Sequence, residues 1–275
     1  MKSKVLIAAA LAFSCLLTAC SSEHKVAIVA HRGYWESEAA GNAHNSIASL
    51  AEAQRIGVWG SEFDVNMTKD GVLLVFHDGE VNGKAFIEHD AEDFADVTLP
   101  NGEKIPTLDE YLDQFGKDRD CRLVFELKTH PSEFTEIAVD KSIAALKEHG
   151  LLDPKQVIFI SFSIEQCELF AKKCPGFTVQ FLNDTYSIEQ LCAKGINGID
   201  SHYNVFYRDS SWYSAAREHS MSVNAWTVNE ERDIRNMIEL GVDYITTNKP
   251  EKVRAILEEM GVKELKAGEN FKSHK

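Results

Sequence analysis

The stretch GSEFDVNMTKDGVLLVFHD, residues 60–78, decides how the rest of the chain is interpreted. Glu62 and Asp64 are separated by one residue, and in an extended strand such side chains leave the same face. Residues 69–71 (KDG) are typical of a turn, and the apolar run that follows them ends at His77. The stretch therefore predicts a short hairpin that brings two carboxylates and a histidine into one region.

Two carboxylates on one strand face repel each other unless a cation lies between them. A hard divalent ion such as Mg²⁺ or Ca²⁺ takes oxygen ligands and suits such a pair. The alternative is a solvated strand face, which an isolated Glu-x-Asp pair usually is. The pattern recurs, however, because the apolar strand 26–30 runs into His31-Arg32-Gly33, and a later strand presents Glu126 and Lys128 on one face. Three strands that end in charged groups predict a common site.

Apolar strands alternate with helices through most of the chain. The expected strands are 26–30, the first arm of the hairpin, 122–128, 157–162, 177–182, 198–201, 222–228 and 243–247; the expected helices are 45–55, 106–115, 134–149, 164–173, 188–194, 211–219, 230–240 and 251–260. Eight such units predict an α/β fold, a (β/α)₈ TIM barrel with a small hairpin insertion after strand two. Residues 79–105 are expected to be irregular and the polar tail 263–275 to be frayed.

The N-terminus has the features of an export signal. Lys2 and Lys4 precede an apolar run that is shorter than a membrane-spanning helix. The run ends in Leu-Thr-Ala-Cys at Cys20 and resembles the lipobox of bacterial lipoproteins. That resemblance implies a signal peptide 1–19, a lipidated linker 20–25 and an exported protein held to a membrane of the bacterial cell envelope. An ordinary secretory signal in which Cys20 is incidental is the alternative.

The net charge of the chain limits the kinds of partner that it can bind. The formal net charge is −14, and removal of Lys2 and Lys4 with the signal would leave −16. Such a chain lacks the cationic footprint of a nucleic-acid-binding protein, and it has no electrostatic attraction to anionic lipid. Membrane contact is therefore expected through the N-terminal lipid only. An anionic substrate would need local compensation, which Arg32, Lys128 and a metal ion can supply.

Four cysteines lie beyond the signal and Cys20, namely Cys121, Cys167, Cys174 and Cys192. None belongs to a Cys-x-x-Cys pair, which argues against zinc. They are expected to be small buried hydrophobic residues, with a disulfide between Cys174 and Cys192 as the open alternative in an exported chain.

The motifs together resemble one enzyme family. They are HRG at 31–33, ExDVNMTKDGVLLVFHD at 62–78, IPTL at 105–108, ELK at 126–128, SF at 161–162, NAWTVN at 224–229 and TTNKP at 246–250. In this order and spacing they resemble the glycerophosphodiester phosphodiesterase family, over nearly the whole chain after residue 25.

The resemblance implies a role for each matching residue. Glu62, Asp64 and Glu126 correspond to the ligands of one divalent cation, Mg²⁺ or Ca²⁺. His31 and His77 correspond to the acid–base pair, although which is acid and which is base stays open. Arg32 and Lys128 correspond to the phosphate contacts. Trp226 corresponds to a tryptophan that would wall the organic part of the substrate, with an ordinary barrel-core aromatic as the alternative.

The sequence departs from the family pattern in two places. Many members carry Glu-Asn-Thr before the first helix, where this chain has His44-Asn45-Ser46. If the missing acid helps to orient the site, Asn45 or a water must serve instead. Many members also follow His-Asp with Arg-Thr-Thr, where residues 79–82 read GEVN. That loop borders the expected mouth, so the alcohol part of the substrate stays open.

The expected activity is metal-dependent hydrolysis of a small-molecule glycerophosphodiester to an alcohol and glycerol 3-phosphate. A neighbouring hydroxyl attacking first would give a cyclic phosphate that water then opens. One alternative is a phospholipase D-like lyase of the sphingomyelinase D type, which would release the cyclic phosphate. Another is a lipoprotein that binds glycerophosphodiesters without catalysis.

Overall fold

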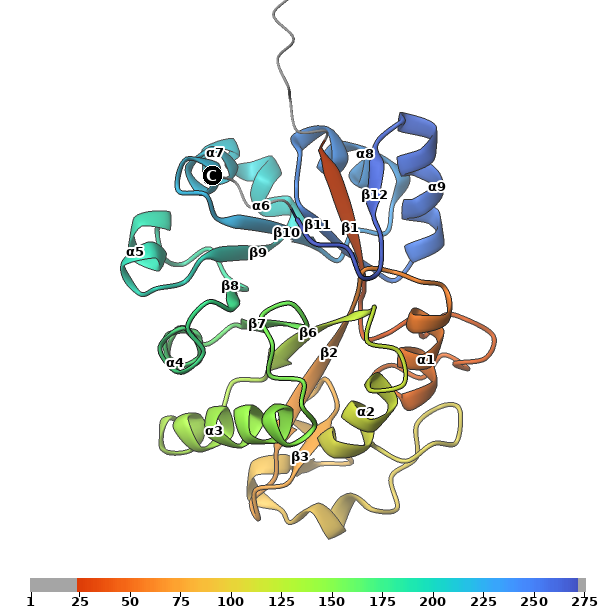
Figure 1. The fold of residues 1–275 in the computed structure, drawn as a ribbon. Coiled ribbons are helices and arrows are strands. Elements are labelled where there is room, and N and C mark those ends of the chain that lie inside the picture. Colours follow the sequence, from red (N-terminus) through yellow and green to blue (C-terminus); the bar gives the residue numbers. More distant parts are fainter. Residues whose placement is uncertain (1–23, 272–275) are drawn as a thin grey trace, which may run out of the picture.

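Eight parallel strands close into a barrel in the computed structural model, which describes residues 24–271 (Figure 1). They are β1 (Lys25–Ala30), β2 (Gly60–Met67), β6 (Arg122–Leu127), β7 (Val157–Ser161), β8 (Thr178–Phe181), β9 (Gly198–His202), β10 (Ser222–Trp226) and β11 (Tyr244–Thr247). Closure occurs at β1, which pairs with β11 on one side and with β2 on the other. The predicted (β/α)₈ barrel is confirmed.

Helices surround the barrel. They are α1 (Ile47–Arg55), α2 (Leu108–Phe115), α3 (Ser132–Glu148), α4 (Ile164–Lys173), α5 (Ile188–Ala193), α6 (Tyr203–Arg208), α7 (Ser210–Glu218), α8 (Glu231–Leu240) and α9 (Pro250–Met260). Ser46, Thr107 and Ser187 each begin a helix with a reciprocal capping box. The sequence predicted one helix over 211–219, but α6 precedes α7; six residues are too few to show a helical period.

Alternate strand residues separate into two cores. In β6, Val124 belongs to the cluster inside the barrel, whereas Leu123 and Phe125 pack under the helices. Both faces of each strand are covered, as in other parallel sheets. Glu126 lies two residues after Val124, and this alternation places it on the interior face, at the end of the strand where barrel enzymes carry their active sites.

The predicted hairpin is present. β2 pairs antiparallel with β3 (Leu73–Val75), and the turn between them contains Gly71 at a φ of +81°, a conformation that glycine adopts at little cost. Residues 79–105 are less irregular than predicted, because they hold a second small hairpin and two 3₁₀ turns. Phe86, Phe94 and Leu99 give this insertion a small core of its own; Figure 1 shows it in yellow beyond α2.

The expectation of a frayed tail is wrong for residues 263–271. β12 (Lys263–Leu265) pairs parallel with the start of β1. Beyond it, the carbonyl of Glu269 accepts hydrogen bonds from Trp59 Nε1 at 3.1 Å and from Arg122 Nη2 at 3.0 Å, and Phe271 packs against Tyr244. The tail therefore covers the N-terminal end of the barrel. Its apolar positions are too few to form a period in the sequence. Residues 272–275 lie outside the described part.

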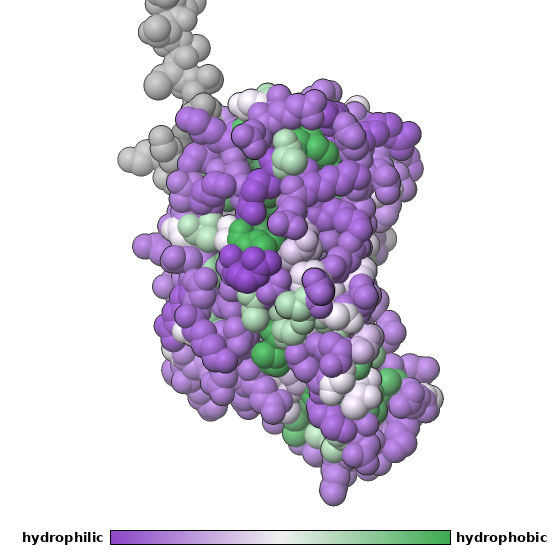
Figure 2. All heavy atoms as spheres, turned by 90° about the vertical axis from the view of Figure 1, so that its right-hand side faces the viewer, coloured by the Kyte–Doolittle hydropathy of each residue, from purple (hydrophilic) through white to green (hydrophobic). Residues whose placement is uncertain are grey.

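The four cysteines after residue 24 are free thiols, as expected from their small apolar character. Cys121, Cys167 and Cys174 are buried, and Cys192 is partly exposed. The face shown in Figure 2 is mostly hydrophilic, with small separate hydrophobic areas. Within residues 24–271, none of the helices combines the length and apolar character that crossing a membrane requires. The predicted signal peptide and Cys20 lie outside the described residues.

Candidate active site

Three buried carboxylates meet at the C-terminal end of neighbouring strands. Glu62 and Asp64 leave the same face of β2, and Glu126 of β6 is in register with Asp64. Each is less than a tenth exposed, and each offers an oxygen that lies within 4.8 Å of the others. Oε1 of Glu62 is buried and has no hydrogen-bond partner among the described residues. The group has the donor atoms, the spacing and the unmet charge of a site for a divalent cation.

The pKa values reflect this crowding. Burial raises the pKa of Glu62 well above its usual range, and Asp64 and Glu126 raise it further. Burial and then Asp64 raise the pKa of Glu126 to about 7. Although burial opposes ionisation of Asp64, its pKa stays below the usual value because Lys128, His77 and Arg32 face it. Glu62 and Glu126 thus resist ionisation beside the ionised Asp64, which indicates that a cation belongs among the three acids.

Lys128 and Arg32 stand beside the acids. Lys128 Nζ lies 2.6 Å from Glu126 Oε1 and 3.1 Å from Asp64 Oδ1. Arg32 Nε lies 3.6 Å from Asp64 Oδ2, and the Arg32 backbone N–H donates to Glu62 Oε2 at 2.8 Å. The chain turns sharply there, since Arg32 and Gly33 both have positive φ. A Cβ on Gly33 would come within 2.4 Å of Ser49 Oγ, so glycine is required. The guanidinium of Arg32 and the ammonium of Lys128 thus lie beside the acids, where they can contact an anionic substrate group.

His31 and His77 line the same cavity of about 100 Å³ as Glu62 and Glu126. The Nδ1 of His31 lies 2.7 Å from Asn248 Oδ1, and the Nδ1 of His77 lies 2.7 Å from Asp78 Oδ1. Each ring is therefore held through Nδ1, which leaves Nε2 for proton transfer.

The pKa values of both imidazoles lie below the ordinary value. Burial and then Arg32 lower the pKa of His31 to about 4. Burial also lowers the pKa of His77, although Asp64 and Asp78 oppose the shift. The neutral form, which can accept a proton, is thus favoured at neutral pH.

Asn45 contacts the acid cluster directly. Its Nδ2 donates to Asp64 Oδ2 at 2.8 Å, and its Oδ1 accepts the backbone N–H of Asp64 at 3.2 Å. Ser46 then begins α1. The ring of His44 meets the ring of Trp35 edge-on, with 4.0 Å between the ring centroids. Asn45 therefore holds Asp64 through two hydrogen bonds.

Trp226 forms an apolar wall. Its indole Nε1 donates to the carbonyl of Asp200 at 2.9 Å, and its ring meets Phe162 and His202 edge-on. Together with Ile160 and Leu182, Trp226 and Phe162 line the cavity next to the acids. The structure thus places Trp226 at the site as well as in the barrel interior.

Sequence reasoning missed two residues. Asn248 follows the last barrel strand, whereas the acids lie on β2 and β6, so the sequence does not assign it to the site. However, β11 neighbours β1, and Asn248 therefore meets His31. Asp200 was not considered, although it lies on an interior position of β9 and lines the cavity. In both cases the available signal was a polar residue at or near the end of a barrel strand.

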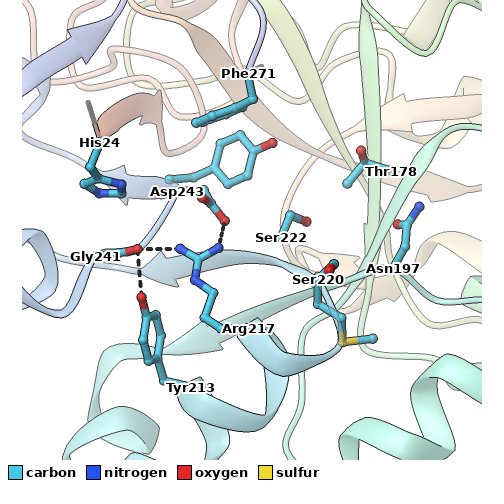
Figure 3. A pocket seen from close by; sticks show the side chains of 12 residues that line it. His24, Thr178, Asn197, Tyr213, Arg217, Ser220, Ser222, Gly241, Asp243 and Phe271 are labelled. Atoms are coloured by element: carbon cyan, nitrogen blue, oxygen red, sulfur yellow. Dashed lines mark hydrogen bonds and ion pairs between the residues drawn. The ribbon is translucent and has the colours of Figure 1, made fainter. Parts of the chain in front are cut away.

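A second cavity, of about 800 Å³, lies at the opposite end of the barrel (Figure 3). Arg217 points into it, but its guanidinium already contacts the Asp243 carboxylate and the Gly241 carbonyl. Tyr213 also donates to the Gly241 carbonyl. These polar groups satisfy one another, so the smaller cavity beside the acids carries the chemistry.

Known proteins agree with this geometry. The sequence pattern of the Glycerophosphoryl diester phosphodiesterase family matches residues 31–252. The chain belongs to this family. A glycerophosphodiester phosphodiesterase from Caldanaerobacter subterraneus subsp. tengcongensis is 29% identical over 247 residues, which cover 82% of this chain and 96% of the relative. The family resemblance inferred from the motifs is thereby confirmed.

Solved structures of the family share the fold. A glycerophosphodiester phosphodiesterase from Parabacteroides distasonis has 39% identity and a TM-score of 0.83, over 87% of this chain and 99% of that one. An Oleispira antarctica phosphodiesterase, solved with the product sn-glycerol-3-phosphate, has 22% identity and a TM-score of 0.73, over 87% of this chain and 98% of that one. The second likeness concerns the barrel alone.

Proposed function

We propose that this glycerophosphoryl diester phosphodiesterase family member hydrolyses small glycerophosphodiesters to an alcohol and glycerol 3-phosphate. One observation carries the proposal: three buried acids, two imidazoles and two cationic side chains lie together at the C-terminal end of the barrel, and five of these seven side chains line one cavity. Family membership and the relatives' names support the substrate class.

Phosphodiesters resist attack because their oxygens are anionic and their leaving groups are poor. Arg32 offers a planar guanidinium to phosphoryl oxygens, and Lys128 adds a point charge. His31 and His77 present Nε2 atoms, one to take a proton from the attacking oxygen and the other to protonate the departing alkoxide. Asn248 and Asp78 hold those rings. A divalent cation on the acids would supply charge neutralisation and activate a hydroxyl group.

The cation is proposed to be Mg²⁺ or Ca²⁺. The donor set of Glu62, Asp64 and Glu126 consists of carboxylate oxygens, which such hard ions prefer. Softer metals favour imidazole or thiolate ligands. Titrating each ion into chelator-treated protein, with metal content and turnover read together, would identify the ion.

A coupled assay with glycerophosphocholine, with and without chelator, tests the activity. Glu62→Gln, Asp64→Asn and Glu126→Gln should each abolish turnover and metal retention. Asp243→Asn is a matched control, because Asp243 is a buried acid at the other end of the barrel. Normal turnover and normal metal content in any of the three site variants would disprove the proposed site. A cyclic phosphate that persists in phosphorus NMR of the products would identify a lyase instead.

The protein is further proposed to be an exported lipoprotein of the bacterial cell envelope, held by lipid on Cys20. The Leu-Thr-Ala-Cys pattern after the apolar run supports this. Cys20→Ser should leave an active enzyme outside the membrane fraction. Cys15→Ser, which changes a cysteine inside the apolar run, should leave anchoring intact. Recovery of the Cys20→Ser protein in the membrane fraction would remove the proposed anchor.

A further inference from the structure

Asp200 is a buried acid that the proposed reaction does not use. It lies on β9, is 1% exposed and lines the cavity that contains His31 and Glu62. Its Oδ1 has no hydrogen-bond partner among residues 24–271. An unsatisfied buried oxygen costs free energy and is uncommon in folded proteins. This atom therefore needs a partner that the described side chains do not supply.

The neighbours of Asp200 leave it without a counter-charge. Asn224 hydrogen-bonds its side chain, and Asn224 is itself bonded to Thr246 Oγ1 at 3.0 Å. No ion pair joins Asp200 to a cationic side chain in the described part of the chain. Burial, and then the charge of Glu126, raises the pKa of Asp200 well above its usual range. A carboxyl group in such surroundings suits a neutral hydrogen-bonding partner better than a cation.

Asp200 stands apart from the proposed metal ligands. The carboxylate group whose oxygens lie within 4.8 Å of one another consists of Glu62, Asp64 and Glu126 and does not include it. In the strand order, β9 is four strands from β2 and thus faces it across the barrel. A substrate whose phosphate lies at the acids would extend its organic part toward Asp200.

The wall around Asp200 is mostly apolar, apart from Thr246, whose hydroxyl is already hydrogen-bonded to Asn224. Trp226 is fixed against it, because the indole donates to the Asp200 carbonyl. Phe162 and Leu182 complete the lining on that side. The cavity of about 100 Å³ equals roughly three waters at ~30 Å³ each, so it takes a group of a few heavy atoms. A carboxyl oxygen without a partner on a mostly apolar wall is the complement of a short polyol, whose carbons meet the wall and whose hydroxyl meets the carboxyl.

We propose that Asp200 Oδ1 hydrogen-bonds a hydroxyl group of the substrate's glycerol part and so selects glycerol-bearing phosphodiesters. The identity of the ligand rests on the proposed function. Asp200 is a specificity residue in this scheme and takes no proton from the reacting atoms.

Isothermal titration of Ca²⁺-loaded full-length protein with glycerol 3-phosphate and with methyl phosphate tests the proposal. The wild type should bind glycerol 3-phosphate more tightly, because methyl phosphate has no hydroxyl group to offer. Asp200→Leu keeps the number of side-chain heavy atoms and removes the polar ones. It should weaken the binding of glycerol 3-phosphate about tenfold and change the binding of methyl phosphate little. Asp200→Ala should do the same, so the result does not depend on one variant folding well.

Gln180→Leu is the matched control. Gln180 is also fully buried and has an unpartnered oxygen, but it does not line the cavity, so the preference for glycerol 3-phosphate should survive. Three results with the Asp200 variants would overturn the proposal. They are an equal loss of affinity for both ligands, an unchanged preference for glycerol 3-phosphate, and weaker Ca²⁺ binding. A wild type that binds both ligands equally would also overturn it, even with glycerophosphocholine turnover intact. Absent turnover with a retained preference would instead refute only the proposed function.

Discussion

The imidazole of His31 is held by the side-chain amide of Asn248, with 2.7 Å between Nδ1 and Oδ1. The contact exists because β1 and β11 lie side by side, with Ala30 in register with Thr247. An amide oxygen accepts a hydrogen bond, so Nδ1 carries the proton and Nε2 keeps a lone pair in the neutral ring. Asn248 is therefore a positioning residue for His31.

Replacing Asn248 by Asp should shift the pH dependence of kcat/KM to higher pH on its acid side. A carboxylate beside His31 stabilises the imidazolium, so the pKa of His31 rises from about 4. If the neutral ring is needed, the acid limb of kcat/KM then shifts to higher pH. Asn270→Asp makes the same charge change at the other end of the barrel, beside Arg122, and should leave the limb in place. An unmoved limb in Asn248→Asp would argue against a positioning role.

The two histidines should differ by substrate. His31→Ala and His77→Ala should each lower turnover of an alkyl diester by roughly 10² to 10⁴, the usual share of general acid–base catalysis. Metal content should persist, because neither ring is assigned as a ligand. In an aryl diester the p-nitrophenolate leaving group needs little protonation. Only the variant that lacks the general acid should therefore regain turnover on this substrate. Near wild-type rates on an alkyl diester in both variants would contradict the mechanism.

Stabilisation by the divalent ion should increase with pH. In the metal-free fold the pKa of Glu126 is raised from 4.5 to about 7. Its proton therefore contributes stability that is fully present below about pH 4.5 and is lost as pH rises through 7. The ion requires the ionised carboxylates, so Ca²⁺ should raise Tm more at pH 8 than at pH 5. At 100 times the Kd measured at pH 8, the ion should add about 2.7 kcal/mol to the free energy of unfolding. Glu126→Gln should reduce the shift at both pH values. Equal wild-type shifts at pH 5 and pH 8 would show that these acids do not control binding.

The C-terminal tail should contribute to stability. Phe271→Ala removes ring contacts with Trp59 and Tyr244 and loosens the segment whose Glu269 carbonyl accepts from Arg122. We expect a loss of about 1–3 kcal/mol in the free energy of unfolding, measured by urea denaturation. Turnover should be unaffected, because the tail lies opposite the acids. Ile137→Ala, at a large hydrophobic residue that is 47% exposed, is the control and should cost little. A Phe271→Ala protein with the same free energy of unfolding as the wild type would show that the tail does not contribute to stability.

The sequence by itself determined the barrel and most of the site. Strand residues alternate between two covered faces, so apolar runs at regular intervals revealed the strands. The same alternation placed Glu62, Asp64, Glu126 and Lys128 on one side before any tertiary contact was known. His31 and His77 were also predicted, because each directly follows an apolar run within a motif.

Only the tertiary structure decided which distant residues complete the site. The only local signal of Asn248 and Asp200 is a polar residue at or near a strand end. Their roles depend on strands that become neighbours, or face each other, when the barrel closes. The tail is a similar case, because its few apolar residues gain their value from the open end of the barrel that they cover. Periodicity records which face of an element is buried, whereas contacts across a closed barrel depend on the packing of the whole chain.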